Sequence, residues 1–316
     1  MTARRTLLLG TAAALCAPAI ASMPWPNRPL RLLVAYATGG VSDDITRLLA
    51  ERLAQRIGVP VLVENRGGAG GALAMAALAR APADGHTLCF SAITPLTVAP
   101  LLGPVRYDPQ RDIAPVAGVM STPVLVVATP ALAARDLPEA LGRAGTAGLR
   151  WASSGLGTTG HLVMEQVRRA SGVAITHVPY KGGSQQISDA LGGQFELLST
   201  NVGSVQLGHV RKGRLQALAV GAPARVPVLP NVQTLAEAGF PAANLWSLFG
   251  VFAPGDTPTD LREQINTEVN AVLSEPDLQQ RLVAVNNLPM LDSPRGFAQR
   301  IAQEAVVHRA LLQQQR

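Results

Sequence analysis

The chain has 316 residues, 47% of them hydrophobic, and a formal charge of +6 at neutral pH. A chain of this length suits two domains of ordinary size, each able to bury its own core. Aromatic residues make up 4% of the chain, and no basic block is interleaved with them, which argues against a nucleic-acid partner. The mild positive charge instead favours an acidic small molecule.

The N-terminus has the pattern of an export signal. Arg4 and Arg5 precede an apolar stretch over 7–15, and the small residues at 19–21 suit a signal peptidase, so we expect a signal peptide at 1–21. The apolar stretch is too short for a membrane anchor, which needs about 20 residues. The paired arginines leave the general and the twin-arginine export routes both open. The mature protein is therefore expected in the periplasm.

Removal of this segment leaves Cys89 as the single cysteine, so no disulfide can form within one mature chain. Cys16 is a poor lipid-attachment site because Leu15 stands before it, where a small residue is preferred. We expect a freely soluble periplasmic monomer.

From residue 30 onward, strand-like and helix-like segments alternate with short loops between them. The expected strands are 30–36, 61–64, 87–91, 124–128, 149–152, 174–179, 195–199, 215–220 and 248–252. The expected helices are 42–57, 71–80, 137–143, 160–171, 184–191, 204–212, 258–274, 276–285 and 294–314. Such alternation is typical of parallel sheets covered by helices on both faces.

A proline-rich connection with Pro223, Pro227 and Pro230 separates the middle of the chain from its last strand and helices. We expect those last helices to return to the first unit. The predicted fold is α/β with two lobes, each a mainly parallel sheet flanked by helices: lobe 1 from 22–123 and 225–316, and lobe 2 from 124–224. A chain that crosses twice between lobes can close on a ligand by hinge bending.

Two glycine-rich turns, one in each half of the chain, lie between a strand and a helix. In the first, YATGGVSDD at 36–44, Gly39 and Gly40 permit close backbone approach, and Ser42 or Asp43 can cap the following helix. Asp43 can alternatively accept a hydrogen bond from a ligand amine or hydroxyl. Free backbone N–H groups at such helix starts bind anions.

The second turn, SSGLGTTGH at 153–161, matches the GxGxxG fingerprint of dinucleotide-binding proteins. That fingerprint requires an acidic residue about 20 positions further on, and none occurs between Glu165 and Asp189. We interpret its serine and threonine hydroxyls as donors to a carboxylate. A third glycine cluster at 65–71 lacks the Lys and Ser/Thr of a phosphate-binding loop and is interpreted as a tight entry into the next helix.

Known catalytic patterns are missing from the sequence: HExxH, paired CxxC and GxSxG do not occur, and the five histidines lie far apart. A triad of Ser153, His161 and Asp189 can be drawn, but its spacing gives no specific support. We therefore expect neither an enzyme nor a cofactor or metal.

Nine segments, in the same order and over essentially the whole mature chain, resemble the Bug family of periplasmic receptors of tripartite tricarboxylate transporters (TctC-like). They are PLRLLVAYATGGVSDDITRLLAERL, VLVENRGGAGG, ALARAPADGHTL, RYDPQRDIAPV, WASSGLGTTGHL, HVPYKGGSQQISDALGGQ, RKGRLQALAV, LPNVQTLAEAGFP and TPTDLREQIN. The resemblance implies a type II periplasmic-binding-protein (Venus flytrap) fold that clasps a carboxylated metabolite.

The resemblance also implies where the ligand binds: one carboxylate at the loop 36–43, hydroxyls and amides at 153–159, the PYKG segment at 179–182, and the aspartate of the following helix. The chain departs from the family at Thr38, where a proline is common, and at 199–201, where an acidic residue is common and Ser-Thr-Asn stands. The predicted ligand-binding residues are Tyr36, Thr38, Gly39, Gly40, Ser42, Asp43, Ser91, Ser153, Ser154, Gly155, Thr158, Thr159, His161, Tyr180, Asp189 and Thr200.

The expected function is capture of a small carboxylate and its delivery to the membrane subunits of a tripartite tricarboxylate transporter. An alternative with the same fold is a sensor that docks onto a histidine kinase, which a neighbouring two-component system without transporter genes would favour. Dicarboxylates, amino acids and aromatic acids all remain possible ligands.

Overall fold

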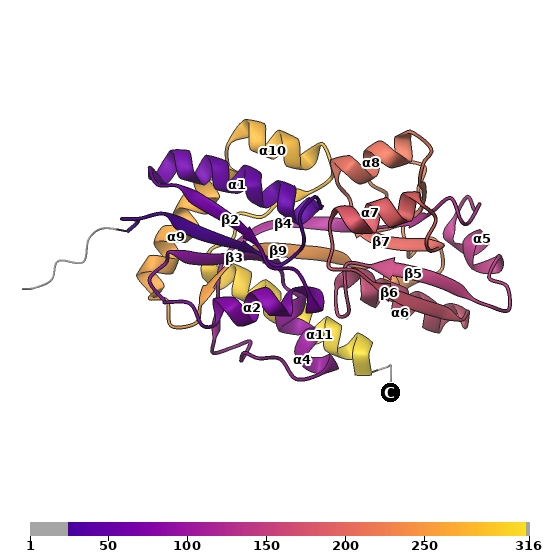
Figure 1. The fold of residues 1–316 in the computed structure, drawn as a ribbon, viewed down its shortest axis with the longest axis horizontal. Helices are drawn as coiled ribbons and strands as arrows, with labels where there is room; N and C mark the ends of the chain where they lie inside the picture. The colour runs from indigo at the N-terminus through magenta and orange to yellow at the C-terminus, as the bar shows by residue number, and fades with distance from the viewer. Residues whose placement is uncertain (1–24, 314–316) are drawn as a thin grey trace, which may run out of the picture.

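The computed structural model describes residues 25–313, which form two α/β lobes lying side by side (Figure 1). The expected signal peptide at 1–21 lies outside the described residues. Within 25–313, no helix is both long and apolar enough to cross a membrane.

The sheet of the first lobe has the strand order β2-β1-β3-β9-β4. Its parallel part follows the expected alternation, since β1 pairs in parallel with β2 and β3. Its other part is antiparallel, because β9 runs opposite to both β3 and β4. The strands are β1 (Leu30–Val34), β2 (Val61–Asn65), β3 (Thr87–Ala92), β4 (Ile113–Ala128) and β9 (Trp246–Pro254), and a short β10 (Leu288–Pro289) also pairs with β4.

Helices cover both faces of this sheet, with α1 and α10 above it and α2 and α11 below it in Figure 1. Their apolar sides meet the strands in a core that includes the fully buried Phe90, Phe252 and Phe297. The helices are α1 (Val41–Ile57), α2 (Ala72–Leu78), α3 (Thr94–Thr97), α4 (Ala99–Leu102), α9 (Thr259–Leu273), α10 (Pro276–Val283) and α11 (Pro294–Gln313), with a 3₁₀ turn η1 (Ala69–Gly71) before α2.

The second lobe repeats this plan around the fully buried Trp151 and Phe195. Strand β5 pairs in parallel with β6 and β7, and β4 is antiparallel to β7 and β8. Its elements are α5 (Leu137–Gly142), β5 (Leu149–Ser153), α6 (Thr159–Ser171), β6 (Ile175–Pro179), α7 (Ser184–Leu191), β7 (Leu197–Asn201), α8 (Ser204–Arg211), β8 (Gln216–Gly221) and η2 (Pro241–Ala243).

Strand β4 is 16 residues long and belongs to both sheets. Up to Pro123 it pairs with β9, and from Val124 it pairs with β7 and β8. The sequence predicts only the part from 124 to 128, because Pro115 and Gly118 interrupt the pattern of a central strand. Register shifts between β4 and β9 beside these residues show that two bulges absorb the interruptions.

Residues 225–245 pack on the second lobe, which differs from the expected boundary after 224. Val226 and Leu229 join the cluster around Phe195, and Leu235 N donates to Val220 O at 2.8 Å. Apolar side chains in the proline-rich connection therefore complete the core of the second lobe. We propose that the second crossing between lobes lies near residues 245 and 246 rather than at 224.

Helix α11 contacts both lobes near its end. Leu312 shares a small apolar cluster with Val98 of the first lobe and Leu162 of α6. Gln166 Nε2, also on α6, donates to Leu311 O at 3.4 Å. The last helix therefore returns to the first lobe, as expected, and in addition reaches the second.

Candidate functional site

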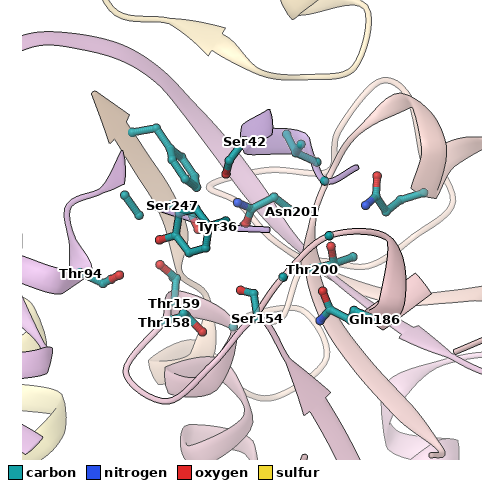
Figure 2. A pocket seen from close by; sticks show the side chains of 18 residues that line it. Tyr36, Ser42, Thr94, Ser154, Thr158, Thr159, Gln186, Thr200, Asn201 and Ser247 are labelled. Atoms are coloured by element: carbon teal, nitrogen blue, oxygen red, sulfur yellow. Dashed lines mark hydrogen bonds between the residues drawn. The ribbon is translucent and has the colours of Figure 1, made fainter. Parts of the chain in front are cut away.

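A cavity lies between the two lobes (Figure 2) and holds about 560 Å³ of space between atoms, part of it open to solvent. The residues that line it are Tyr36, Gly40, Val41, Ser42, Ala92, Thr94, Ser154, Thr158, Thr159, Gly160, Gly182, Gly183, Gln186, Thr200, Asn201, Gln206, Ser247 and Phe249.

The structure brings seven of the predicted ligand-binding residues to this cavity: Tyr36, Gly40, Ser42, Ser154, Thr158, Thr159 and Thr200. Nine lie outside its lining: Thr38, Gly39, Asp43, Ser91, Ser153, Gly155, His161, Tyr180 and Asp189. A role in ligand binding stays a prediction for all sixteen residues.

Four helices begin at the cavity: α1, α6, α7 and α8 each contribute lining residues from their first turn. Each follows directly on a strand with parallel neighbours, so the cavity lies at the carboxyl ends of β1, β5, β6 and β7, the usual binding edge of α/β sheets. No side chain caps the N-termini of α1, α7 and α8. Uncapped N–H groups and helix dipoles make this a favourable place for negative charge.

None of the residues that line the cavity carries a formal charge. An anion bound there would be held by neutral hydroxyl, amide and backbone N–H groups. Hydrogen bonds from neutral donors to a charged group contribute about 1.5 to 3 kcal/mol each.

Three hydroxyl groups gather at one end of the cavity: those of Tyr36 and Thr94 in its lining, and that of Ser91 beside them but outside the lining. Burial raises the pKa of Tyr36 well above its ordinary value, so its hydroxyl stays protonated and can donate. Among the described residues, the fully buried Ser91 Oγ and Thr94 Oγ1 have no hydrogen-bond partner with good geometry. A buried hydroxyl without a partner costs about 1 to 3 kcal/mol, so this end of the cavity suits a ligand oxygen or an ordered water.

Amide side chains from the second lobe form another part of the wall, and they are not among the residues predicted from the sequence. Asn201 Oδ1 accepts a hydrogen bond from Ser247 Oγ at 3.0 Å, which joins the ends of β7 and β9. Gln186 and Gln206 come from the first turns of α7 and α8. A glycine precedes each of these helices and a serine begins it. The same signal that identified the first two turns, glycine and hydroxyl residues at a helix start, could have found these residues.

Asp43 supports the first loop instead of facing the cavity. It accepts hydrogen bonds from Gly39 N at 3.0 Å and Asn65 Nδ2 at 2.9 Å, and pairs with Arg47. Burial alone would raise the pKa of Asp43, but these partners outweigh it and hold the pKa below its ordinary value. The carboxylate is thus ionised and fixes the loop after β1.

Ser153 and His161 support the second loop from behind. Ser153 Oγ lies 2.7 Å from His177 Nε2 and 3.2 Å from Gly155 N, whereas His161 Nδ1 accepts from Gly157 N at 3.3 Å. Asp189 accepts from the Tyr180 hydroxyl at 2.7 Å. The catalytic triad considered from the sequence is therefore not assembled, because Ser153, His161 and Asp189 each have a different partner.

The lobes meet directly at the mouth of the cavity. Ala37 N donates to Lys181 O at 3.0 Å, and Ser184 N donates to Thr38 O at 3.1 Å. This close approach needs glycine: a Cβ at Gly183, which has φ +82°, would overlap Thr38 O, and one at Gly70 would overlap Leu156 O. The two lobes are therefore closed on each other in this structure.

The family model described as "Tripartite tricarboxylate transporter family receptor" matches residues 45–316. The chain belongs to this family. It is 34% identical over 294 residues to the protein BugT of Bordetella pertussis, covering 90% of this chain and 89% of BugT. These findings confirm a Bug-family, TctC-like receptor.

Similar solved structures agree with the two-lobed fold. Rpa4515 of R. palustris, solved with adipate, has 31% identity and a TM-score of 0.86, covering 92% of this chain and 97% of that one. MatC of Rhodopseudomonas palustris, solved with bound malate, has 30% identity and a TM-score of 0.85, covering 91% and 99%. The family and its structural neighbours are periplasmic solute-binding proteins rather than enzymes.

Proposed function

We propose that this receptor closes on a small dicarboxylate that lacks an amino group, and delivers it to the membrane subunits of a tripartite tricarboxylate transporter. The observation that carries the proposal is a cavity without charged residues at the starts of four helices. The adipate and malate bound by the two similar receptors belong to this class of acid.

The affinity that such a site can reach follows from its donors. Micromolar binding corresponds to about 8 kcal/mol. Four to six hydrogen bonds to charged oxygens, at about 1.5 to 3 kcal/mol each, reach this value after the cost of immobilising the ligand. No arginine or lysine in the cavity wall is required.

The same wall disfavours amino acids. A buried ammonium group needs a carboxylate partner, and an unpaired buried charge costs several kcal/mol. The cavity lining offers no aspartate or glutamate. We therefore expect aspartate to bind about 10- to 100-fold more weakly than malate.

The test is a thermal-shift panel on the mature protein, followed by calorimetry. The panel holds C3 to C6 dicarboxylates, tricarboxylates, aspartate, glutamate and aromatic acids. Stabilisation by dicarboxylates with little effect of amino acids is the expected result, and preference for an amino acid would contradict the proposed ligand class. Mass spectrometry of the denatured protein would identify any acid that remained bound through purification, since such a ligand would suppress the shift.

Export to the periplasm is part of the proposal and rests on the sequence at 1–21. Cleavage after Ala21 gives a mature chain that begins at Ser22. The intact mass of the protein from a periplasmic extract checks this, and a full-length mass there would contradict it.

A further inference from the structure

A second surface of the molecule is strongly apolar and exposed. It is a groove on the outside of the lobes, with small residues of η1, α2 and α4 in its floor and larger side chains on its walls. Leu73 and Leu102 of the first lobe are 54% and 39% exposed, and Leu156 of the second lobe is 55% exposed. We name the surface formed by these three leucines and the floor between them the composite groove.

The composite groove depends on the closed arrangement of the lobes. Leu156 lies in the loop between β5 and α6, while the rest of the groove belongs to α2, α4 and the chain around them. The contact is direct: a Cβ at Gly157 would lie 3.2 Å from Leu102 Cδ1. Opening the lobes would separate Leu156 from the floor and remove one wall.

A basic depression adjoins the composite groove and shares Leu73, Ala76 and Arg106 with it. Four arginines line this depression: Arg31, Arg66, Arg80 and Arg106. Glu64 accepts from Arg31 and Arg66, whereas Arg80 and Arg106 form no ion pair with any acidic residue between 25 and 313. The depression therefore keeps an excess of positive charge next to an apolar groove.

We propose that the composite groove docks a protein segment with an apolar side chain flanked by carboxylates, on the periplasmic side of the membrane partner. An exposed apolar patch with a charged rim is typical of a protein interaction site. The unpaired arginines select an acidic partner by charge complementarity. Because Leu156 completes the groove only on closure, docking favours the ligand-loaded receptor. The proposal rests on the proposed receptor function.

The test uses the full chain in its own host cells, with the photo-reactive residue p-benzoylphenylalanine in place of Leu73. Cells are illuminated with and without malate or adipate. We expect an adduct with a non-membrane segment of an integral membrane protein, at a site where acidic and apolar residues adjoin. The combination Arg80→Glu with Arg106→Glu should reduce this adduct at least fivefold, and so should Leu156→Asp.

Val306→Asp is the matched control, since Val306 is 70% exposed on α11 and is not among the residues that line the groove. It should leave the adduct unchanged, and melting curves of all variants check that they fold. Absence of a membrane-protein adduct, an adduct with phospholipid, or an adduct insensitive to the arginine reversals would overturn the proposal. A different result is an adduct that behaves as expected while the purified receptor binds neither malate nor adipate. That result would overturn the proposed ligand class and leave the proposed docking site standing.

Discussion

Gly183 decides at a single position how closely the two lobes approach. Its φ of +82° and the overlap that a Cβ would make with Thr38 O leave no room for a side chain in the closed state. We predict that Gly183→Ala lowers the affinity for malate or adipate at least 100-fold, because the hydrogen bonds between the lobes cannot form.

Gly213→Ala provides a control at another glycine with positive φ, since Gly213 has φ +64° and a Cβ there would meet nothing within 4 Å. Alanine at position 213 incurs the strain of a positive φ, about 1 to 2 kcal/mol. Gly183 has φ +82° and ψ −153°, a region that is essentially restricted to glycine, and a Cβ there would also block closure. Calorimetry measures both affinities, and equal losses in the two variants would contradict a specific role for Gly183.

Neighbouring threonines at the start of α6 have separable roles. Thr158 caps the helix: its Oγ1 accepts from His161 N at 3.3 Å and donates to Gly155 O at 2.8 Å. Thr159 also lines the cavity and has no such capping contact among the described residues. We predict that Thr159→Val weakens acid binding about tenfold with little change in stability, whereas Thr158→Val lowers the free energy of unfolding by about 1 kcal/mol.

Urea unfolding and calorimetry on the two single variants distinguish these effects. A loss of stability in Thr159→Val as large as that in Thr158→Val would show that Thr159 is structural. Such a result would remove its hydroxyl from the proposed donors.

At the scale of elements, the buried His308 and the half-buried His177 make stability depend on pH. Burial lowers the pKa of His308 on α11 to about 4, and burial together with the neighbouring His161 lowers the pKa of His177 on β6 to about 4. Each therefore takes up its proton mainly on unfolding, so stability falls as the pH drops from about 6.5 to about 4. For His308, which is 2% exposed, the loss over this window is up to about 3 kcal/mol.

The prediction is that His308→Gln loses less stability than the wild type between pH 6.5 and 4.5, whatever its stability at pH 7. Urea unfolding at several pH values measures this, and parallel curves for the two proteins would contradict it. Protonation of carboxylates with lowered pKa, such as Asp43, reduces stability mainly at pH values below this range.

The alternation of strands and helices was predictable because buried strands and amphipathic helices have different apolar periods. The full length of β4 was not, since its prolines and glycine are tolerated only through bulges against β9. The glycine-rich turns after β1 and β5 were found because several hydroxyl and glycine residues cluster there. Ser247 and Asn201 were missed because 46 residues separate them, and only the crossing of β9 beside β7 brings them together.

At the scale of the whole molecule, the two lobes are joined by long strands and meet again at the cavity mouth. We predict that malate or adipate reduces the radius of gyration of the wild-type protein in solution, and that Gly183→Ala shows little reduction at the same acid concentration. Small-angle X-ray scattering measures both. A variant as compact as the loaded wild type would mean that the contacts between the lobes do not limit closure.

Four helices start at the cavity, and every residue except proline supplies a backbone N–H group at such a start. Only a substitution by proline removes a backbone N–H. Most substitutions at the helix starts therefore leave the proposed backbone donors to the acid in place. Substitutions at a few facing side chains, such as Tyr36, Thr94 and Asn201, can meanwhile alter which acid fits. Receptors of this kind can change their ligand specificity during evolution while their backbone hydrogen-bond donors stay the same.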